Sequence, residues 1–359
     1  MKRAFLLSIL SFIFCVFTFG QTVPSGFTIS SIGSGWVGPV GTAFSSDGQK
    51  LFVWEKSGKV YVCNRNGSGT YIKQATPVLN ISEEVGEWRD HGLLGFALDP
   101  QFSTNGLIYL LYNVDRHHLM NFGTPAYNAS TNDYLKATIG RVTRYQTITS
   151  GSNLVADLST RFVLIGETRQ TGIPLLYESH GVGSLAFAAD GMLLITTGDG
   201  ASYSTTDPGS IAHTYYVQAL ADGIIRPEEN VGAFRSQLLN SHCGKLLRID
   251  PTNGNGVGSN PFFSASSPRS ARSRVWALGF RNPFRMTIKP GTGSTNPSAG
   301  DIGEVYIGDV GWGTWEELNI VDKKGQNCGW PLFEGHTTLN SYYNLTTAMA
   351  DEAIAYMNR

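Results

Sequence analysis

The sequence predicts an all-β fold built from several small antiparallel sheets. Glycine accounts for 42 of the 359 residues and aromatic residues for 11%, a composition that suits short strands joined by tight turns. Many short runs alternate apolar residues, as strands with one buried face do. A strand–turn–strand template also recurs at intervals of roughly fifty to a hundred residues, a pattern typical of a β-propeller with insertions between its blades. Because these intervals are irregular, an array of β-sandwiches is the alternative.

The template has the same parts wherever it recurs. A small or apolar strand is followed by a turn rich in Asp, Pro and Gly, and then by a second apolar strand. A third strand often opens on glycine, as in GKVYVCN, GRVTRYQ and GKLLRID. We therefore expect four-stranded antiparallel blades, of which this chain holds about four. The copies are GTAFSSDGQKLFVWEKSGKVYVCN at Gly41, GLLGFALDPQFSTNGLIYLLYNV at Gly92, GSLAFAADGMLLITTGDG at Gly183, and RNPFRMTIKPGTG with GEVYIGDV from Arg281.

Two insertions interrupt the template, at Asp115–Ile139 and Ala201–Ser241. Loops of this length in a compact domain are usually functional, and in a propeller they would shape an entrance on one face. The second insertion is expected to hold a short helix around Ala233–Asn240. The first contains His117 and His118, which could ligate a metal. Since adjacent residues on a strand or loop point apart, we favour solvated loop residues instead.

The N-terminus, MKRAFLLSILSFIFCVFTFGQ, predicts a secretory signal peptide over residues 1–20 and a mature propeller domain over 21–359. Its apolar run is shorter than the ~20 residues that a membrane span needs, which disfavours an anchor. Bulky residues before Cys15 disfavour lipidation there. No later segment is long and apolar enough to span a bilayer. We expect an exported protein, secreted or periplasmic, without a membrane span.

Charge and cysteine content exclude several classes of function. Lys plus Arg number 27 and Asp plus Glu 28, so there is no basic excess to bind nucleic acid. Cys63, Cys243 and Cys328 have no CxxC spacing that would bind zinc. They are expected to be small core residues, and a Cys243–Cys328 disulfide is the alternative.

The chain lacks the HExxH, GxSxG, Walker and GxGxxG motifs of the common hydrolases and nucleotide-binding proteins. Its candidate polar groups lie at the ends of predicted strands. His180 could be a general base, although a histidine that closes a turn is the plainer interpretation. Arg281 and Asn282 are equally consistent with a structural and an anion-binding role. Gly311 and Trp312 would offer backbone carbonyls, which are hard oxygen ligands suited to Ca²⁺.

Five segments of the chain, taken in order, resemble the successive motifs of the soluble glucose/sorbosone dehydrogenase family. The resemblance implies a six-bladed propeller that binds pyrroloquinoline quinone (PQQ) with Ca²⁺, and a relationship to the propeller of the Hedgehog-interacting proteins. It runs from about residue 26 to residue 335. The segments are GLLGFALDPQF at Gly92, SHGVGSLAFAADGMLLITTGDG at Ser179, QLLNSHCGKLLRIDP at Gln237, VWALGFRNPFRM at Val275, and GDVGWGTWEELNIVDKKGQNCGWP at Gly308.

The resemblance implies oxidation of an aldose at C1 to the lactone. His180 falls on the family's base, which takes the proton of the anomeric hydroxyl while hydride leaves C1 for the quinone. Arg281 falls on the arginine that polarises the accepting quinone carbonyl, and Asn282 on a neighbouring cofactor contact. Gly311 and Trp312 fall on the pair whose carbonyls hold the Ca²⁺. A small-molecule sugar is thus the expected substrate.

The sequence departs from the family pattern at several positions. Ser179 stands where the glucose-oxidising members carry an acid, Asp90 where they carry a glutamine near the sugar, and Trp312 where they carry a proline. Asp90 is therefore a candidate substrate-binding residue. After Gly335 only 24 residues follow, HTTLNSYYNLTTAMADEAIAYMNR, although the family's last blades supply a lysine and arginines that hold the cofactor. We expect the full-length parent to oxidise sugars and this chain alone to bind the quinone weakly or not at all.

Two other functions are compatible with a propeller. The first is a catalytically silent propeller that binds a protein or glycan partner. The second is a Ca²⁺-dependent lactonase, which would need several carboxylate or amide side chains around the metal. The sequence does not identify the sugar, the electron acceptor or the oligomeric state.

Overall fold

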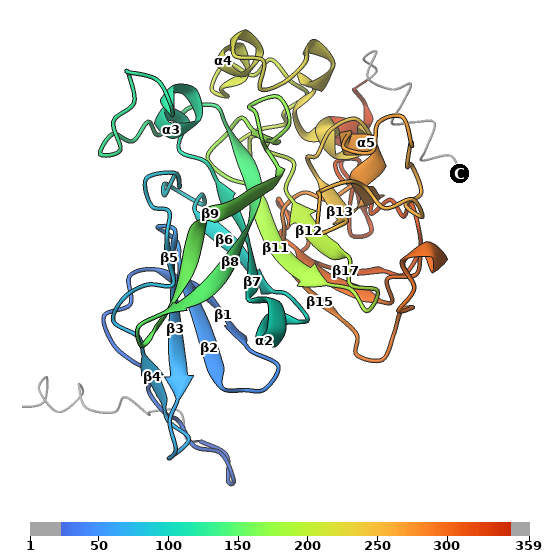
Figure 1. The fold of residues 1–359 in the computed structure, drawn as a ribbon. Helices are drawn as coiled ribbons and strands as arrows, with labels where there is room; N and C mark the ends of the chain where they lie inside the picture. Colours follow the sequence, from blue (N-terminus) through green and yellow to red (C-terminus); the bar gives the residue numbers. More distant parts are fainter. Residues whose placement is uncertain (1–22, 346–359) are drawn as a thin grey trace, which may run out of the picture.

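Residues 23–345 of the computed structural model are described below, and they form four antiparallel sheets arranged as the blades of a propeller (Figure 1). The all-β prediction and the estimate of about four blades are both confirmed, whereas six blades remain a prediction. The predicted signal peptide over residues 1–20 lies outside the described residues.

The expectation of four strands in each blade is wrong for the first two blades, which have five strands each because β5 and β9 add to β3 and β8. In blade 1 the order is β1-β2-β3-β4, and β5 also pairs with β3; in blade 2 it is β10-β8-β7-β6, and β9 also pairs with β8. The strands of blade 1 are β1 (Pro39–Phe44), β2 (Lys50–Glu55), β3 (Lys59–Arg65), β4 (Tyr71–Lys73) and β5 (Leu79–Asn80). Those of blade 2 are β6 (Leu93–Leu98), β7 (Leu107–Asn113), β8 (Thr138–Ser150), β9 (Asn153–Ile165) and β10 (Ile173–Leu175).

Blade 3 is a four-stranded meander, and blade 4 has three strands within the described residues. A separate hairpin, β18 (Phe333–Glu334) with β19 (Thr337–Thr338), follows them. The strands of blade 3 are β11 (Val182–Phe187), β12 (Leu193–Thr197), β13 (Lys245–Ile249) and β14 (Val275–Leu278). Those of blade 4 are β15 (Pro283–Ile288), β16 (Val305–Asp309) and β17 (Glu317–Val321).

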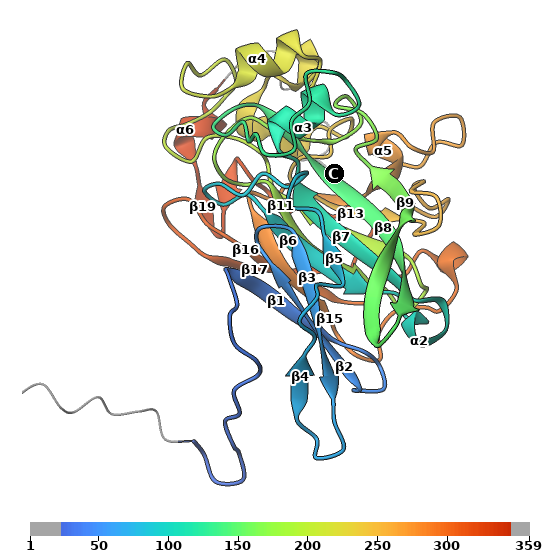
Figure 2. The same cartoon turned by 60° about the vertical axis from the view of Figure 1, so that its left-hand side comes forward.

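The first strand of each blade is its innermost strand. β1 packs against β6, β6 against β11, and β11 against β15, so these four strands lie around a common axis (Figures 1 and 2). Apolar cores fill the spaces between successive blades: one joins blades 1 and 2, one joins blades 2 and 3, and one joins blades 3 and 4. The blades are therefore held together by face-to-face burial of their apolar side chains.

Both predicted insertions lie at the same end of the molecule, where Figures 1 and 2 show α3 (Arg116–Asn121) and α4 (Tyr216–Ala221). The expected helix around Ala233–Asn240 is a 3₁₀ helix, η2 (Gly232–Gln237), which ends three residues early. In its last turn, Ser236 Oγ and Gln237 Nε2 both donate to the carbonyl of Trp330. The other helices are α2 (Phe102–Asn105), η1 (Pro227–Glu229), α5 (Ala271–Arg274), η3 (Pro297–Ala299) and α6 (Asn340–Tyr343).

Within the described part of the chain, two further expectations can be compared with the structure. Cys63, Cys243 and Cys328 are all unpaired, with the first two fully buried, as expected of small core residues. Among residues 23–345, no helix has the length and apolar character to span a bilayer.

Candidate active site

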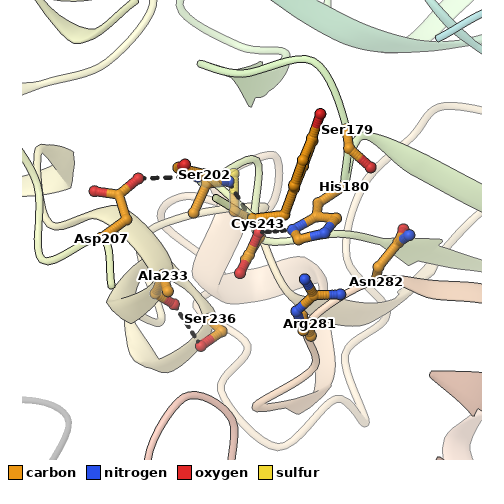
Figure 3. Close-up of polar contacts among 12 residues, drawn as sticks. Ser179, His180, Ser202, Asp207, Ala233, Ser236, Cys243, Arg281 and Asn282 are labelled. Atoms are coloured by element: carbon orange, nitrogen blue, oxygen red, sulfur yellow. Dashed lines mark hydrogen bonds and ion pairs between the residues drawn. The ribbon is translucent and has the colours of Figure 1, made fainter. Parts of the chain in front are cut away.

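The predicted site residues gather at one end of the propeller axis because of where they stand in the blade template. Asp90, His180 and Arg281 precede the innermost strands β6, β11 and β15, respectively. Since these strands lie side by side around the axis, the residues that precede them meet at the same end. Figure 3 shows the result: His180 and the Arg281 guanidinium face one another, with Ser179 and Asn282 beside them.

His180 forms a buried pair with Asp199, a residue that follows strand β12. The His180 Nδ1 atom lies 2.9 Å from Asp199 Oδ1, and the two side chains are 3% and 1% exposed. Asp199 also accepts hydrogen bonds from the Ala201 amide at 2.9 Å and from Trp330 Nε1 at 2.8 Å. Three donors thus converge on this carboxylate, which keeps it ionised and makes it an acceptor only.

The protonation states follow from burial and from this pairing. Burial lowers the pKa of His180, and the nearby Arg281 charge adds to that effect, while Asp199 opposes it. Burial would raise the pKa of Asp199, but His180 and the other partners outweigh it, so this pKa lies below its usual value. At neutral pH His180 is a neutral imidazole that donates from Nδ1 to Asp199. Its basic lone pair is therefore on Nε2.

The backbone holds His180 in an uncommon conformation. Its φ of 55° lies in the left-handed region, which is costly for a residue other than glycine. The chain at Gly198–Gly200 holds it there, because Gly198 N donates to Gly181 O at 2.7 Å and Gly200 N donates to His180 O at 2.9 Å. A Cβ at Gly198 would lie 2.3 Å from the His180 carbonyl oxygen, so glycine is required for this approach.

Arg281 and Asn282 are positioned by Asp309 at the end of strand β16. Their backbone amides donate to the two carboxylate oxygens of Asp309 at 3.0 and 2.6 Å. Burial raises the pKa of Asp309 to about 7 despite these two hydrogen bonds. The Arg281 side chain is buried over the Trp330 ring and donates from Nη1 to Val310 O at 2.9 Å. Its Nε has no partner among the described residues, which leaves a buried cationic donor unsatisfied.

Gly311 and Trp312 lie in a turn that wraps around the carboxylate of Glu334. The amides of Trp312, Gly313 and Thr314 all donate to Glu334, the last at 2.8 Å. In a trans peptide the carbonyl points opposite to the N–H of the next residue. The carbonyls of Gly311 and Trp312 are therefore directed away from Glu334, and neither accepts a hydrogen bond within residues 23–345. These are two hard oxygen atoms presented side by side.

Comparisons with known proteins agree with this architecture. The family model described as glucose/sorbosone dehydrogenase matches residues 37–354. The chain belongs to this family. It is 26% identical to the HIPL2 protein of Arabidopsis thaliana over 87% of this chain and 43% of that protein, and 24% identical to quinoprotein glucose dehydrogenase B of Acinetobacter calcoaceticus over 88% and 55%. The chain thus spans about half the length of these relatives.

Among solved structures, a PQQ-bound aldose sugar dehydrogenase from Streptomyces coelicolor superposes with a TM-score of 0.54. The match covers 85% of this chain and 66% of that one at 22% identity, so it supports the fold alone.

Two of the three departures from the glucose/sorbosone dehydrogenase pattern, Ser179 and Asp90, meet in the structure. Ser179 Oγ donates to Asp90 Oδ2 at 2.6 Å, and the Asp90 charge reaches His180, whose pKa it raises slightly against the effect of burial. Asp90 itself is exposed. A carboxylate from a neighbouring blade thus stands near His180.

His117 and His118 lie on α3 and take no part in this site. His118 is 6% exposed, so the expectation of a solvated loop residue is wrong for it: its ring stacks on Phe122 at a centroid distance of 4.5 Å. Within residues 23–345, no group of three or more His, Cys, Asp or Glu side chains could hold a metal ion.

Sequence reasoning missed the residues that hold the site together, which are Asp199, Asp309, Trp330 and Glu334. Asp199 had a readable signal, because it stands between two glycines directly after a strand in TTGDG. Asp309 likewise follows a strand in IGDV. Trp330 and Glu334 gave no comparable signal, since their partners Asp199 and Trp312 are 131 and 22 residues away.

Proposed function

We propose that this protein belongs to a dehydrogenase that oxidises an aldose at C1 to the lactone with PQQ as the oxidant. The observation that carries the proposal is the buried pairing of His180 with ionised Asp199, opposite the Arg281 guanidinium. A neutral base and a fixed positive charge that share one small space suit removal of a proton from a hydroxyl whose oxygen becomes negative.

The proton is taken by His180 Nε2. Asp199 holds the ring by its Nδ1–H, which fixes the tautomer and orientation, and it stabilises the imidazolium that forms. Arg281 is placed to stabilise negative charge on a substrate or cofactor oxygen, since its Nε–H has no hydrogen-bond acceptor among the described residues. Asp90, with Ser179, is placed to accept hydrogen bonds from sugar hydroxyls. These residues therefore orient the substrate and receive its proton.

The residues present fit the proposed cofactor. Arg281 and Asn282 would hold the quinone, and the unsatisfied Arg281 donor is the group that a quinone oxygen or carboxylate would pair with. The carbonyls of Gly311 and Trp312 would hold Ca²⁺, with other oxygen ligands completing the six to eight that this ion takes. When bound, PQQ supplies the hydride acceptor, and Ca²⁺ supplies Lewis acidity.

The test is a titration of the purified chain with PQQ in the presence and absence of Ca²⁺, with the cofactor's absorbance and the melting temperature followed together. We expect binding that needs Ca²⁺ and is lost in Arg281→Ala. Arg144→Ala is the matched control, because Arg144 lies on β8 of blade 2 and donates to the carbonyls of Pro251 and Thr252, which follow β13 of blade 3 and take no part in the candidate active site. Binding that is equal in both variants would contradict the assignment of Arg281.

The same titration tests the expectation that this chain alone binds the quinone weakly or not at all. Micromolar binding, with reduction of an artificial acceptor by an aldose, would overturn that expectation and support the enzyme. If no binding is seen, the chain is extended to the length of its relatives and measured again. Failure of the extended chain would contradict the proposed dehydrogenase function.

A second candidate function is a silent propeller that binds a protein or glycan partner. The observation that favours it is the 2.6 Å hydrogen bond between Ser179 and Asp90, which pairs two of the three residues that depart from the family pattern with each other. This function predicts that His180→Ala leaves the affinity for the partner unchanged. An affinity that falls with that substitution would contradict it. For either function we propose export, on the strength of residues 1–20.

A further inference from the structure

A cavity of about 400 Å³ lies between blades 1 and 2, next to α3. Its walls come from strands β5, β8 and β9 and from the helix of the first insertion. None of the residues that line it belongs to the candidate active site. Its volume falls within the range of roughly 300–1,000 Å³ that small-molecule sites occupy.

A buried carboxylate forms the floor of the cavity. Glu84 is 5% exposed, and its Oε1 accepts from Tyr112 OH at 2.5 Å, Arg141 Nη1 at 2.6 Å and Arg161 Nη2 at 2.7 Å. Three donors on one oxygen leave Oε2 without a hydrogen bond among the described residues. His118 Nε2 lies 3.9 Å from Oε2, too far for a hydrogen bond but near enough for one hydroxyl to contact both.

Each of the two arginines has guanidinium N–H groups that make no hydrogen bond among the described residues. Arg141 uses Nε on the Gly166 carbonyl, and Arg161 uses Nε on Tyr145 OH. Arg141 Nη2 and Arg161 Nη1 have no partner within residues 23–345, and both side chains line the cavity. The site therefore presents free donors next to a free acceptor, the arrangement that binds vicinal hydroxyl groups in pairs.

Apolar surface stands at the rim of the cavity. Phe122 and Leu158 are 62% and 63% exposed, which is unusual for large apolar side chains. Such surface would stack on the C–H face of a ring whose hydroxyls point toward Glu84 and the arginines.

The charge balance excludes a strongly ionic ligand. Arg141 and Arg161 face three lining glutamates, Glu83, Glu84 and Glu167, and Glu167 pairs in turn with Arg269. Three positive and three negative charges therefore cancel. His118 adds none at neutral pH, because burial lowers its pKa to about 4.

We propose that this cavity is a binding site for a neutral saccharide unit, either a free sugar or the terminal residue of a glycan. Hydroxyls would pair with Glu84 Oε2 and the free guanidinium nitrogens of Arg141 and Arg161, and the ring would stack on Phe122. This site is independent of the proposed oxidation at His180.

The test uses methyl glycosides of common hexoses, which cannot be oxidised at C1, and a glycan array for chain ends. Binding of the glycosides to the purified chain is measured by calorimetry and by ligand-detected NMR. We expect Arg161→Met and Phe122→Ala each to weaken binding roughly ten- to a hundredfold. Phe44→Ala is the matched control, since Phe44 is 57% exposed on blade 1 outside this cavity, and we expect it to change nothing.

His180→Ala separates this site from the candidate active site. Glycoside binding that survives His180→Ala but is lost in Arg161→Met supports the proposal. Binding that is lost in His180→Ala and unchanged in Arg161→Met would overturn it, because the sugar would then occupy the candidate active site. Binding of acetate or a uronic acid in preference to neutral sugars would also overturn it, as would the absence of binding by any saccharide tested.

Discussion

Replacing Asp199 with asparagine is expected to switch the tautomer of His180. The carboxylate has no hydrogen to donate, so it accepts from His180 Nδ1 and the Ala201 amide on one oxygen and from Trp330 Nε1 on the other. An amide of the same shape has only one oxygen. It must turn its NH₂ group either toward Trp330 or toward His180 and Ala201.

The second orientation leaves fewer buried donors unsatisfied. If NH₂ faces Trp330, both of its hydrogens and the indole N–H lack acceptors. If NH₂ faces His180, one of its hydrogens bonds to Nδ1, and only the other hydrogen and the Ala201 N–H are lost. His180 must then carry its proton on Nε2, which removes the basic lone pair. Each of these two orphaned buried donors costs about 1–3 kcal/mol, so we expect the unfolding free energy to fall by about 2–6 kcal/mol.

Nitrogen-15 NMR of the imidazole measures the tautomer directly and needs neither cofactor nor substrate. We expect protonated Nδ1 in the wild type and protonated Nε2 in Asp199→Asn. In the loaded dehydrogenase, kcat should fall about 10²- to 10⁴-fold with little change in KM. Asp190→Asn is the matched control, because Asp190 is equally buried and pairs with Arg248 at 2.5 Å, a pair that does not involve His180. It should lower stability without altering the His180 spectrum.

The reasoning would be refuted by an unchanged Nδ1–H signal in Asp199→Asn together with wild-type stability. That result would mean that the carboxylate does not set the tautomer. A changed tautomer with full activity would instead contradict the role of His180 as the base.

Two further predictions concern stability. Burial lowers the pKa values of His91 and His242 to about 3, so below pH 6.5 the unfolded chain binds protons that the folded chain does not bind. The free energy of unfolding, measured with urea, should therefore fall from about pH 6 to pH 4 by about 1.4 kcal/mol per pH unit for each histidine. An unchanged slope in the His91→Asn, His242→Asn double variant would contradict this. Lys245→Met should destabilise the fold by about 3 kcal/mol, because the buried ammonium donates to the carbonyls of Arg235, Ser236 and Cys243 at 2.9, 2.9 and 2.6 Å. A urea unfolding midpoint equal to that of the wild type would contradict this, because the three carbonyls would then have found other partners.

The fold was largely predictable because each blade is a local unit. A strand, a turn and the next strand are adjacent in sequence, so alternation and turn residues specify them, as in β1–β2 and β11–β12. The third strand of blade 3 was also predicted, from the segment GKLLRID, but the pairing of the outer strands was harder to predict. Strand β13 pairs with β12 across the whole second insertion, and β5 joins blade 1 as only two residues. Their pairing is decided by packing against other blades rather than by local pattern.

The site was predictable only in part, for a related reason. His180, Arg281 and Asn282 lie just before the first residues of strands, and the resemblance to the glucose/sorbosone dehydrogenase family marked their positions. Their supports come from elsewhere: Trp330 is 131 residues from Asp199 in sequence, and the Glu334 carboxylate folds back over the turn at Trp312. No spacing rule connects residues so far apart, so the sequence shows reactive groups more readily than the groups that orient them.

This separation explains how the site can be assembled from independent blades. Blade 3 supplies His180, which precedes β11, and Asp199, which follows its partner strand β12. Blade 4 supplies Arg281 and Asn282, which precede β15, and Asp309, which ends its partner strand β16. Each group is flanked by two paired antiparallel strands of its own blade. A hydrogen bond at 2.8 Å from Asp199 N to Arg281 O joins the two groups, and Trp330 contacts both, since its Nε1 donates to Asp199 and its ring lies against the Arg281 guanidinium. A variant that loosens this contact should therefore separate base from cation while leaving the His180–Asp199 pair intact.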